Sequence, residues 1–313
     1  MGTLMNLLGH EVVQQRFTES LAAGSLHHAW LLYGVKGIGK HTLAEKMAAY
    51  LMCESDSACG KCHGCKMLNA GSHPDVFRLG LIEGKRDLNI EQVRGVLAFL
   101  SLSGAESGRR VVILDDAERM NGQAANALLK GLEEPTAGSL LLMVCSDLDR
   151  LPATIRSRCM LQQCSPLHDT EVRQVLEQQE SPVKAAYIDL AVSLAGGSPG
   201  AVSCLQDAKI AEALLSWRQL TVDMTRADVG KIQAWISVNV KLVPHALVVQ
   251  LLVNAVYPVL QMRCDEDGYR GREAIQQALQ ACLRWPGEVV RHSLRAGPAL
   301  LSAVLQLRAA LKK

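Results

Sequence analysis

A glycine-rich turn between an apolar segment and a helical segment constrains the fold of this chain more than any other stretch. Residues 34–42 read Gly-Val-Lys-Gly-Ile-Gly-Lys-His-Thr, after the apolar run 30–33 and before the helix-like stretch 42–52. Glycines let successive backbone N–H groups converge on a phosphate, and a helix N-terminus and a lysine complete such a cradle. The sequence therefore predicts a phosphate-binding loop (P-loop) between a strand and a helix, with these phosphate-binding residues: Gly34, Gly37, Gly39 and Lys40.

The last position of this motif departs from the expected pattern. A Ser or Thr there would supply a hydroxyl for Mg²⁺, but the residue is His41, and Thr42 comes one position later. Two alternatives follow. Either the loop still binds a nucleotide, with Thr42 among the candidate contacts, or it is a glycine turn that only packs a strand on a helix.

Segments of strand and helix character alternate as far as residue 165. The continuous apolar run 111–114 is typical of a strand buried on both faces of a parallel sheet, and 121–134 carries an apolar stripe that stops at Pro135. This alternation predicts an α/β domain with a parallel sheet over residues 1–165. Only helical patterns follow, so we expect a small helical domain at 166–206 and an all-helical domain at 207–313.

Composition and charge limit the class of protein. A chain of 313 residues with 49% hydrophobic residues can bury the cores of several globular domains. Its formal net charge of +2 gives no chain-wide field for nucleic acid or an anionic membrane. The run 247–256 is too short to span a bilayer, and residues 1–8 lack the regions of a signal peptide. We therefore expect a cytoplasmic protein without membrane contact.

Two carboxylates follow the predicted strand 111–114. Asp115 is the residue expected to hold Mg²⁺, directly or through water. The next position normally carries a Glu that polarises the attacking water, but here it is the shorter Asp116. Displacing a catalytic group by about 1 Å can cost roughly a hundredfold in rate. The alternative is that the two carboxylates cap the following helix.

Four of the ten cysteines lie in one short segment, 53–65. Cys53, Cys59, Cys62 and Cys65 form the pattern C-x5-C-x2-C-x2-C. Thiolates are soft ligands, and an x2 spacing lets two sulfurs reach one tetrahedral ion, so the pattern predicts a closed structural zinc site. An iron–sulfur cluster is the alternative metal site, a disulfide is not expected in the cytoplasm, and His63 is expected to face solvent.

Two further segments carry a family resemblance. Residues 126–135 (Asn-Ala-Leu-Leu-Lys-Gly-Leu-Glu-Glu-Pro) and 155–159 (Ile-Arg-Ser-Arg-Cys) resemble the signature segments of AAA+ clamp-loader proteins. The cysteine loop after the P-loop helix is similar to that of the bacterial DNA polymerase III clamp loader. The resemblance covers residues 7–206, whereas the remainder matches only in being helical. It implies an AAA+ RecA-like core, a helical lid and an all-α collar domain.

The resemblance also implies roles for single residues. Motor subunits of the family carry a lid arginine that reads the γ-phosphate, and Gly200 stands at that position. With His41 and Asp116, this change argues against an autonomous ATPase. Arg158 matches an arginine that reaches the nucleotide site of a neighbouring subunit as a finger in trans. The alternative is that Arg158 only pairs with a carboxylate at the end of its short helix.

The expected function follows from this resemblance. It implies a largely non-catalytic subunit that helps ATP-driven loading of the sliding clamp onto primer-template DNA, within a DNA-directed DNA polymerase (nucleotidyltransferase) holoenzyme. Its partners would be motor and delta-type loader subunits at the nucleoid-associated replisome. The expected cofactor is structural Zn²⁺, and binding of ATP and Mg²⁺ is left open. The alternatives are an active AAA+ motor subunit and a zinc nucleic-acid-binding module, for which Lys61 and Lys66 give little positive charge.

Overall fold

The computed structural model describes residues 7–82, 84–102, 104–105, 107–179, 181–266 and 270–312. Its contacts divide the chain into two compact units. Unit 1 comprises Met1–Pro182 and Ala195–Ala201, and unit 2 comprises Val183–Leu194 and Val202–Lys313. The expected domain boundaries at 165 and 206 stay a prediction. Residues 1–6, part of the segment searched for a signal peptide, lie outside the described residues.

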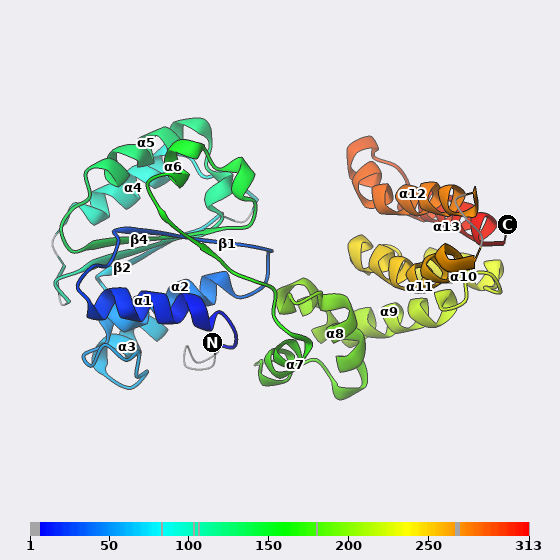
Figure 1. Cartoon of the computed structure of the whole chain (residues 1–313), viewed down its shortest axis with the longest axis horizontal. Helices are drawn as coiled ribbons and strands as arrows, with labels where there is room; N and C mark the ends of the chain where they lie inside the picture. Colours follow the sequence, from blue (N-terminus) through cyan, green and yellow to red (C-terminus); the bar gives the residue numbers. More distant parts are fainter. Residues whose placement is uncertain are drawn as a thin grey trace. The chain divides into compact units, whose positions relative to one another are not determined.

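Unit 1 is built on a five-stranded parallel sheet in the order β2-β3-β4-β1-β5 (Figure 1). The strands are β1 (Ala29–Tyr33), β2 (Val76–Leu79), β3 (Arg110–Leu114), β4 (Ser139–Cys145) and β5 (Met160–Gln163). The P-loop follows β1 and the carboxylate pair follows β3, so both lie at the carboxyl edge of the sheet, separated by β4. The predicted α/β fold with a parallel sheet is confirmed.

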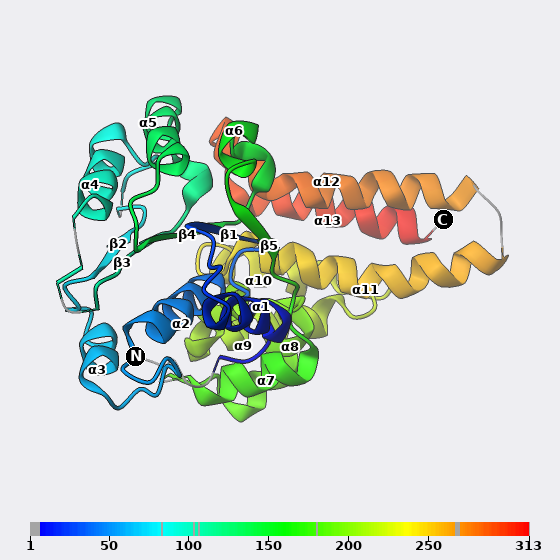
Figure 2. The same cartoon turned by 60° about the vertical axis from the view of Figure 1, so that its left-hand side comes forward.

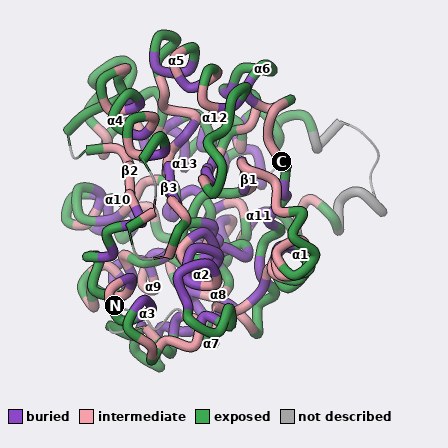
Figure 3. The backbone as a smooth tube through the Cα atoms, turned by 90° about the vertical axis from the view of Figure 1, so that its left-hand side faces the viewer, coloured by how far each residue is buried: buried purple, intermediate pink, exposed green. Residues whose placement is uncertain are grey.

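Helices cover both faces of this sheet (Figures 1 and 2). On one face lie α1 (Glu11–Ala22), α2 (Lys40–Met52) and α3 (His63–Asn69), and on the other α4 (Ile90–Leu100), α5 (Gly122–Glu133) and α6 (Ala153–Arg156). Because alternate residues of a strand face opposite sides, Trp30 and Leu32 join the first core and Ala29 and Leu31 the second. Helix α2 is buried along most of its length (Figure 3). It therefore links the P-loop firmly to the sheet.

Two local differences from the sequence prediction have physical causes. The helical spacing of apolar residues between positions 12 and 21 predicts a helix over residues 7–23. Helix α1 begins only at Glu11, because Gly9 and His10 have left-handed φ angles of 78° and 60°. Helix α3 was not predicted at all. Its seven residues are too few for a periodic apolar pattern, and its start is set by Cys62, whose sulfur accepts a hydrogen bond from the Cys65 N–H. The cysteine segment thus ends in a helix.

The rest of the described chain is helical. The first segment of unit 1 ends with α7 (Asp169–Gln178), and α8 (Ile188–Ala195) precedes the 3-10 helix η5 (Pro199–Gln206). The long helices of unit 2 are α9 (Ala208–Thr221), α10 (Val229–Asn239), α11 (His245–Glu266), α12 (Arg270–His292) and α13 (Ala296–Lys312). Shorter 3-10 turns are η2 (Ala117–Arg119), η3 (Leu148–Arg150) and η4 (Ala185–Tyr187). The helical C-terminal part is confirmed.

Unit 2 has its own core, centred on tryptophans. The rings of Trp217 and Trp235 lie 4.4 Å apart, and the Trp217 Nε1–H donates to the Val248 carbonyl at 3.1 Å. Trp285 closes a second contact by donating to the Ala296 carbonyl. Buried indoles with satisfied N–H groups stabilise helix packing and fix its geometry. Across the described ranges, none of the helices is both long and apolar enough to cross a bilayer.

Candidate nucleotide site and cysteine cluster

The P-loop leaves β1 at Gly34 and enters α2 at Lys40. Gly37 and Gly39 have φ angles of 85° and 97°, a backbone region that favours glycine. A cavity of about 320 Å³ lies beside the loop. Its walls contain the sequence-predicted residues Gly37, Gly39, Lys40, Thr42, Asp115 and Asp116, together with Lys36, His41, Val144 and Ser146. The fold therefore brings the two motifs together, whereas Gly34 is not among the residues that line the cavity and donates its N–H to the Cys145 carbonyl.

Lys40 is turned back onto the loop that carries it. Its ammonium group donates to the carbonyls of Gly34 and Val35, both at 2.7 Å, and to the Ser146 hydroxyl at 3.3 Å. The side chain is buried, and burial lowers its pKa. All three ammonium protons thus have acceptors within the protein.

His41 contacts the first carboxylate of the pair. Its Nδ1 lies 3.0 Å from Asp115 Oδ2. The hydrogen bond to Asp115 raises the pKa of His41. Burial raises the pKa of Asp115, but the hydrogen bond from His41 and the Asp116 N–H outweigh it, so the pKa of Asp115 is lowered. A histidine in place of the expected hydroxyl therefore forms an ion pair with the predicted Mg²⁺ ligand.

The other ring nitrogen of His41 faces a second charged pair. His41 Nε2 lies 3.6 Å from Glu45 Oε1, one turn along α2. Glu45 accepts two hydrogen bonds from Arg78 of β2, at 2.6 and 2.8 Å, and Arg78 also donates to the Leu68 carbonyl of α3. A two-pronged arginine–carboxylate pair has a fixed geometry. The imidazole is thus held between Asp115 and an anchored carboxylate.

Asp116 does not cap a helix. Its φ angle is 49°, and its side chain makes no capping hydrogen bond to η2, while α5 is capped by Asn121. Burial and the neighbouring Asp115 carboxylate raise the pKa of Asp116. The capping alternative considered for the carboxylate pair is therefore not seen.

The segment that would carry a lid arginine packs directly on the P-loop. The Gly200 N–H donates to the Gly37 carbonyl at 3.0 Å, and the Ser198 hydroxyl donates to the Lys36 carbonyl at 2.7 Å. A Cβ atom on Gly200 would lie 2.7 Å from Gly37 Cα, closer than real Cβ contacts. No side chain fits at Gly200 while this contact persists.

These contacts test whether the pocket fits the Mg²⁺-bound nucleotide that its motifs imply. The lysine for the outer phosphates bonds to the loop, the carboxylate for the metal bonds to His41, and the lid segment lies against Gly37. The residues present do not fit an Mg²⁺–ATP complex in this arrangement. Binding of Mg²⁺ or of ATP would require several of these hydrogen bonds and ion pairs to break.

Arg158 follows α6 and lies near the end of α5. It donates to the Thr154 carbonyl at 2.9 Å and forms an ion pair of 2.7 Å with Glu133 Oε1. The exposed fractions of the two side chains are 36% and 51%. The contact is the carboxylate pairing considered as the alternative, but an exposed pair of this kind is weak enough to exchange partners.

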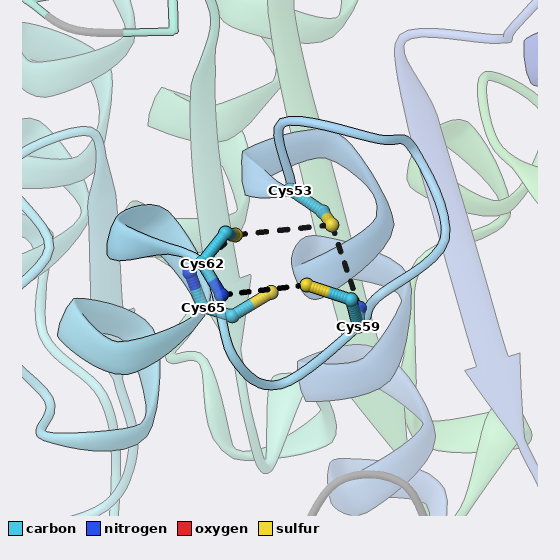
Figure 4. A group of neighbouring side chains, drawn as sticks. All are labelled: Cys53, Cys59, Cys62 and Cys65. Carbon is cyan, nitrogen blue, oxygen red and sulfur yellow. Dashed lines mark hydrogen bonds between the residues drawn. The ribbon is translucent and has the colours of Figure 1, made fainter.

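The four predicted cysteines form one cluster (Figure 4). Their sulfurs all lie within 4.8 Å of one another, and those of Cys53 and Cys62 are 3.9 Å apart. Tetrahedral Zn–S bonds of about 2.3 Å would place sulfurs roughly 3.8 Å apart. This cluster could hold a metal ion, whereas His63 is exposed, as expected.

Backbone N–H groups favour the thiolate form within the cluster. The N–H of Cys59 points to Cys53 Sγ, and that of Cys62 points to Cys59 Sγ, each at 3.4 Å. Burial raises the pKa of the Cys53 thiol, but hydrogen bonds from Ser55 and Cys59 outweigh it and lower that pKa to about 5. These hydrogen bonds favour the thiolate form of Cys53, whereas burial raises the pKa of the Cys65 thiol.

Sequence reasoning missed one buried charge. Asp75 is fully buried and accepts hydrogen bonds from the Ala105 and Ser107 N–H groups and from the Ser107 hydroxyl. Arg110 Nε lies 3.7 Å away. Asp75 thus holds the segment before β3 in place. The sequence signal for this role is an aspartate directly after a proline, and that pattern is too common to be specific.

Comparison with known proteins identifies the family to which the sequence is similar. The sequence profile of the family described as "DNA polymerase III, delta subunit" matches residues 9–168. The chain is 40% identical over 190 residues to DNA polymerase III subunit delta′ of Pseudomonas aeruginosa, covering 59% of this chain and 58% of that protein. It is 35% identical over 194 residues to subunit delta′ of Escherichia coli K12, covering 61% and 58%. With subunit gamma of Buchnera aphidicola the values are 34% over 158 residues, covering 50% and 43%. The matches thus span less than two thirds of these relatives' length.

Proposed function

The chain belongs to the DNA polymerase III delta-subunit family, and we propose that it serves in the clamp loader as a delta-prime-type subunit without ATPase activity of its own. The observation that carries the clamp-loader part of this proposal is the family match, and the two relatives named subunit delta′ support the delta-prime type. The partners of such a subunit would be motor and delta-type loader subunits, the sliding clamp and, through the assembled complex, primer-template DNA.

The pocket supports the non-catalytic part of the proposal. Turnover of ATP depends on metal and charge placed around the transferring phosphoryl group. Lys40 and Asp115 are bonded within the protein, and Gly200 leaves no room for an arginine. The competing function is an active motor subunit. Isothermal titration of the isolated chain with ATP, with and without Mg²⁺, separates the two, since a motor would bind Mg²⁺–ATP and release phosphate steadily.

We further propose that Arg158 acts on a neighbouring subunit's nucleotide site. The guanidinium is held only by an exposed carboxylate and a carbonyl, and it lies at the end of a short helix. Removing an arginine finger costs about 10³ to 10⁵ in turnover at a single site, and one site among several in a ring would show part of that. In the assembled loader, the Arg158 guanidinium would leave the Glu133 carboxylate and bind a phosphate group of the neighbouring site. There it would stabilise the negative charge that develops during ATP hydrolysis.

The test compares two variants within the reconstituted loader. Arg158→Ala is expected to lower DNA-stimulated ATP turnover and clamp loading, because it removes the finger. Glu133→Gln breaks the same internal ion pair from the other side but leaves the arginine in place, so it is expected to retain activity. Equal losses in both variants would mean that Arg158 only holds the end of α6 against α5.

We also propose that the cysteine cluster binds structural Zn²⁺. Four thiolates form a closed tetrahedral set with no position for substrate, which is typical of structural zinc. When bound, the ion would tie the end of α2 to the start of α3 through Cys53 and Cys65. Metal analysis of purified protein, with Cys62→Ser as the variant, tests this assignment.

A further inference from the structure

The carboxylate of Asp115 has both oxygens engaged by the protein itself. Oδ1 accepts the Asp116 N–H at 2.8 Å, and Oδ2 contacts His41 Nδ1 at 3.0 Å. An Mg²⁺ ion demands short oxygen contacts of about 2.0–2.1 Å in octahedral geometry. It could not approach Oδ2 while the imidazole stands there.

The imidazole is also supported from behind. Glu45 faces its Nε2, and Arg78 fixes Glu45 through two short hydrogen bonds. Charges therefore alternate along the series Asp115, His41, Glu45 and Arg78. A rotamer change of His41 away from Asp115 would leave both carboxylates with fewer partners.

We infer that His41 is a built-in counter-ion for Asp115, which takes the place of the divalent cation and keeps such cations out of the P-loop pocket. This inference deepens the proposed lack of ATPase activity, but it rests on the geometry of the pocket and stands whether or not Arg158 acts on a neighbour. It makes His41 the residue that decides whether the pocket admits a metal ion, ahead of the shortened carboxylate at 116. The charge of Asp115 is thereby balanced without a metal ion.

Paramagnetic line broadening by Mn²⁺, an octahedral substitute for Mg²⁺, tests the inference on the full chain with its cysteine cluster loaded. In the wild type, added Mn²⁺ should leave the amide signals of residues 39–42 and 115 sharp. His41→Ser restores the hydroxyl of the motif and frees Asp115 Oδ2. At the same Mn²⁺ concentration, these signals should broaden, with an affinity at least about tenfold above the wild type, equivalent to about 1.4 kcal/mol.

Two further variants complete the experiment. His41→Ser with Asp115→Asn should lose the gained binding, and His292→Ser, which removes an exposed histidine of α12, should behave as the wild type. Mg²⁺ should also raise the melting temperature of His41→Ser and leave that of the wild type unchanged. Wild-type broadening that depends on Asp115, or a His41→Ser protein with no more Mn²⁺ binding than the wild type, would overturn the inference. If His41→Ser does not fold, His41→Thr, which restores the other hydroxyl of the motif, takes its place with the same expected and contradicting results.

Discussion

From the contact between Gly200 and Gly37, we predict that Gly200→Ala lowers the free energy of unfolding. The added methyl would lie 2.7 Å from Gly37 Cα and 3.0 Å from its carbonyl oxygen, both of them backbone atoms that cannot rotate away. Relief requires the two segments to separate, which weakens the hydrogen bonds Gly200 N–H to Gly37 O and Ser198 Oγ to Lys36 O.

The expected magnitude follows from three terms. Overpacking costs about 1–3 kcal/mol, and each weakened hydrogen bond costs up to about 0.5–1.5 kcal/mol. Replacing glycine by alanine returns about 0.4–1 kcal/mol through the unfolded state, because Gly200 has no positive φ. The free energy of unfolding of unit 1 should therefore fall by about 1–5 kcal/mol.

Urea unfolding and hydrogen exchange measure this change. Exchange should rise in the peptide that covers residues 34–40. The matched control is Gly95→Ala, an exposed position within α4 with no atom within 4 Å of the added methyl, where stability should increase by about 0.5–1 kcal/mol. If Gly200→Ala also stabilises the protein, residues 198–200 do not rest on the P-loop and the account of the closed pocket is wrong.

Three other outcomes are expected. Purified protein should contain one zinc ion per chain, and Cys62→Ser should lose it while Cys204→Ser keeps it; a full zinc content in Cys62→Ser would contradict the assignment. The isolated chain should release phosphate from ATP no faster than background, and steady turnover that disappears in Lys40→Ala would show that the pocket is active. Asp75→Asn should lower the free energy of unfolding by about 1.5–3 kcal/mol, the usual range for hydrogen bonds to a charged group, and a loss below that in urea unfolding would mean that the segment before β3 is held by other contacts.

Much of the fold could be predicted because its signals are local. The apolar run at 111–114 and the apolar stripe at 121–134 match β3 and α5 closely, since buried parallel strands and amphipathic helices have distinct periodicities. The predicted start of α1 was wrong because the left-handed backbone of His10 is not visible in an apolar pattern. The short helix α3 was missed for the same kind of reason, as its start depends on a sulfur acceptor.

The sequence indicated which residues come together in the candidate site, but it did not indicate the hydrogen bonds and ion pairs between them. Spacing alone placed Lys40, His41 and Asp115 in one pocket and the four cysteines in one cluster. It could not show that His41 reaches Asp115, because His41 lies in α2 and Asp115 follows β3, far along the chain. Neither could it show that Gly200 rests on Gly37, since that contact joins segments far apart in the chain.

Helix α2 joins the two sites, with the P-loop at its first residue and Cys53 directly after its last. A rise of 1.5 Å per residue over these thirteen residues separates its ends by about 18–20 Å. Because the helix is largely buried, it offers a rigid rod between a metal position and the pocket. Co²⁺ substituted into the cysteine cluster would therefore serve as a fixed magnetic reference, from which pseudocontact shifts could follow any displacement of the P-loop as the chain joins its partners.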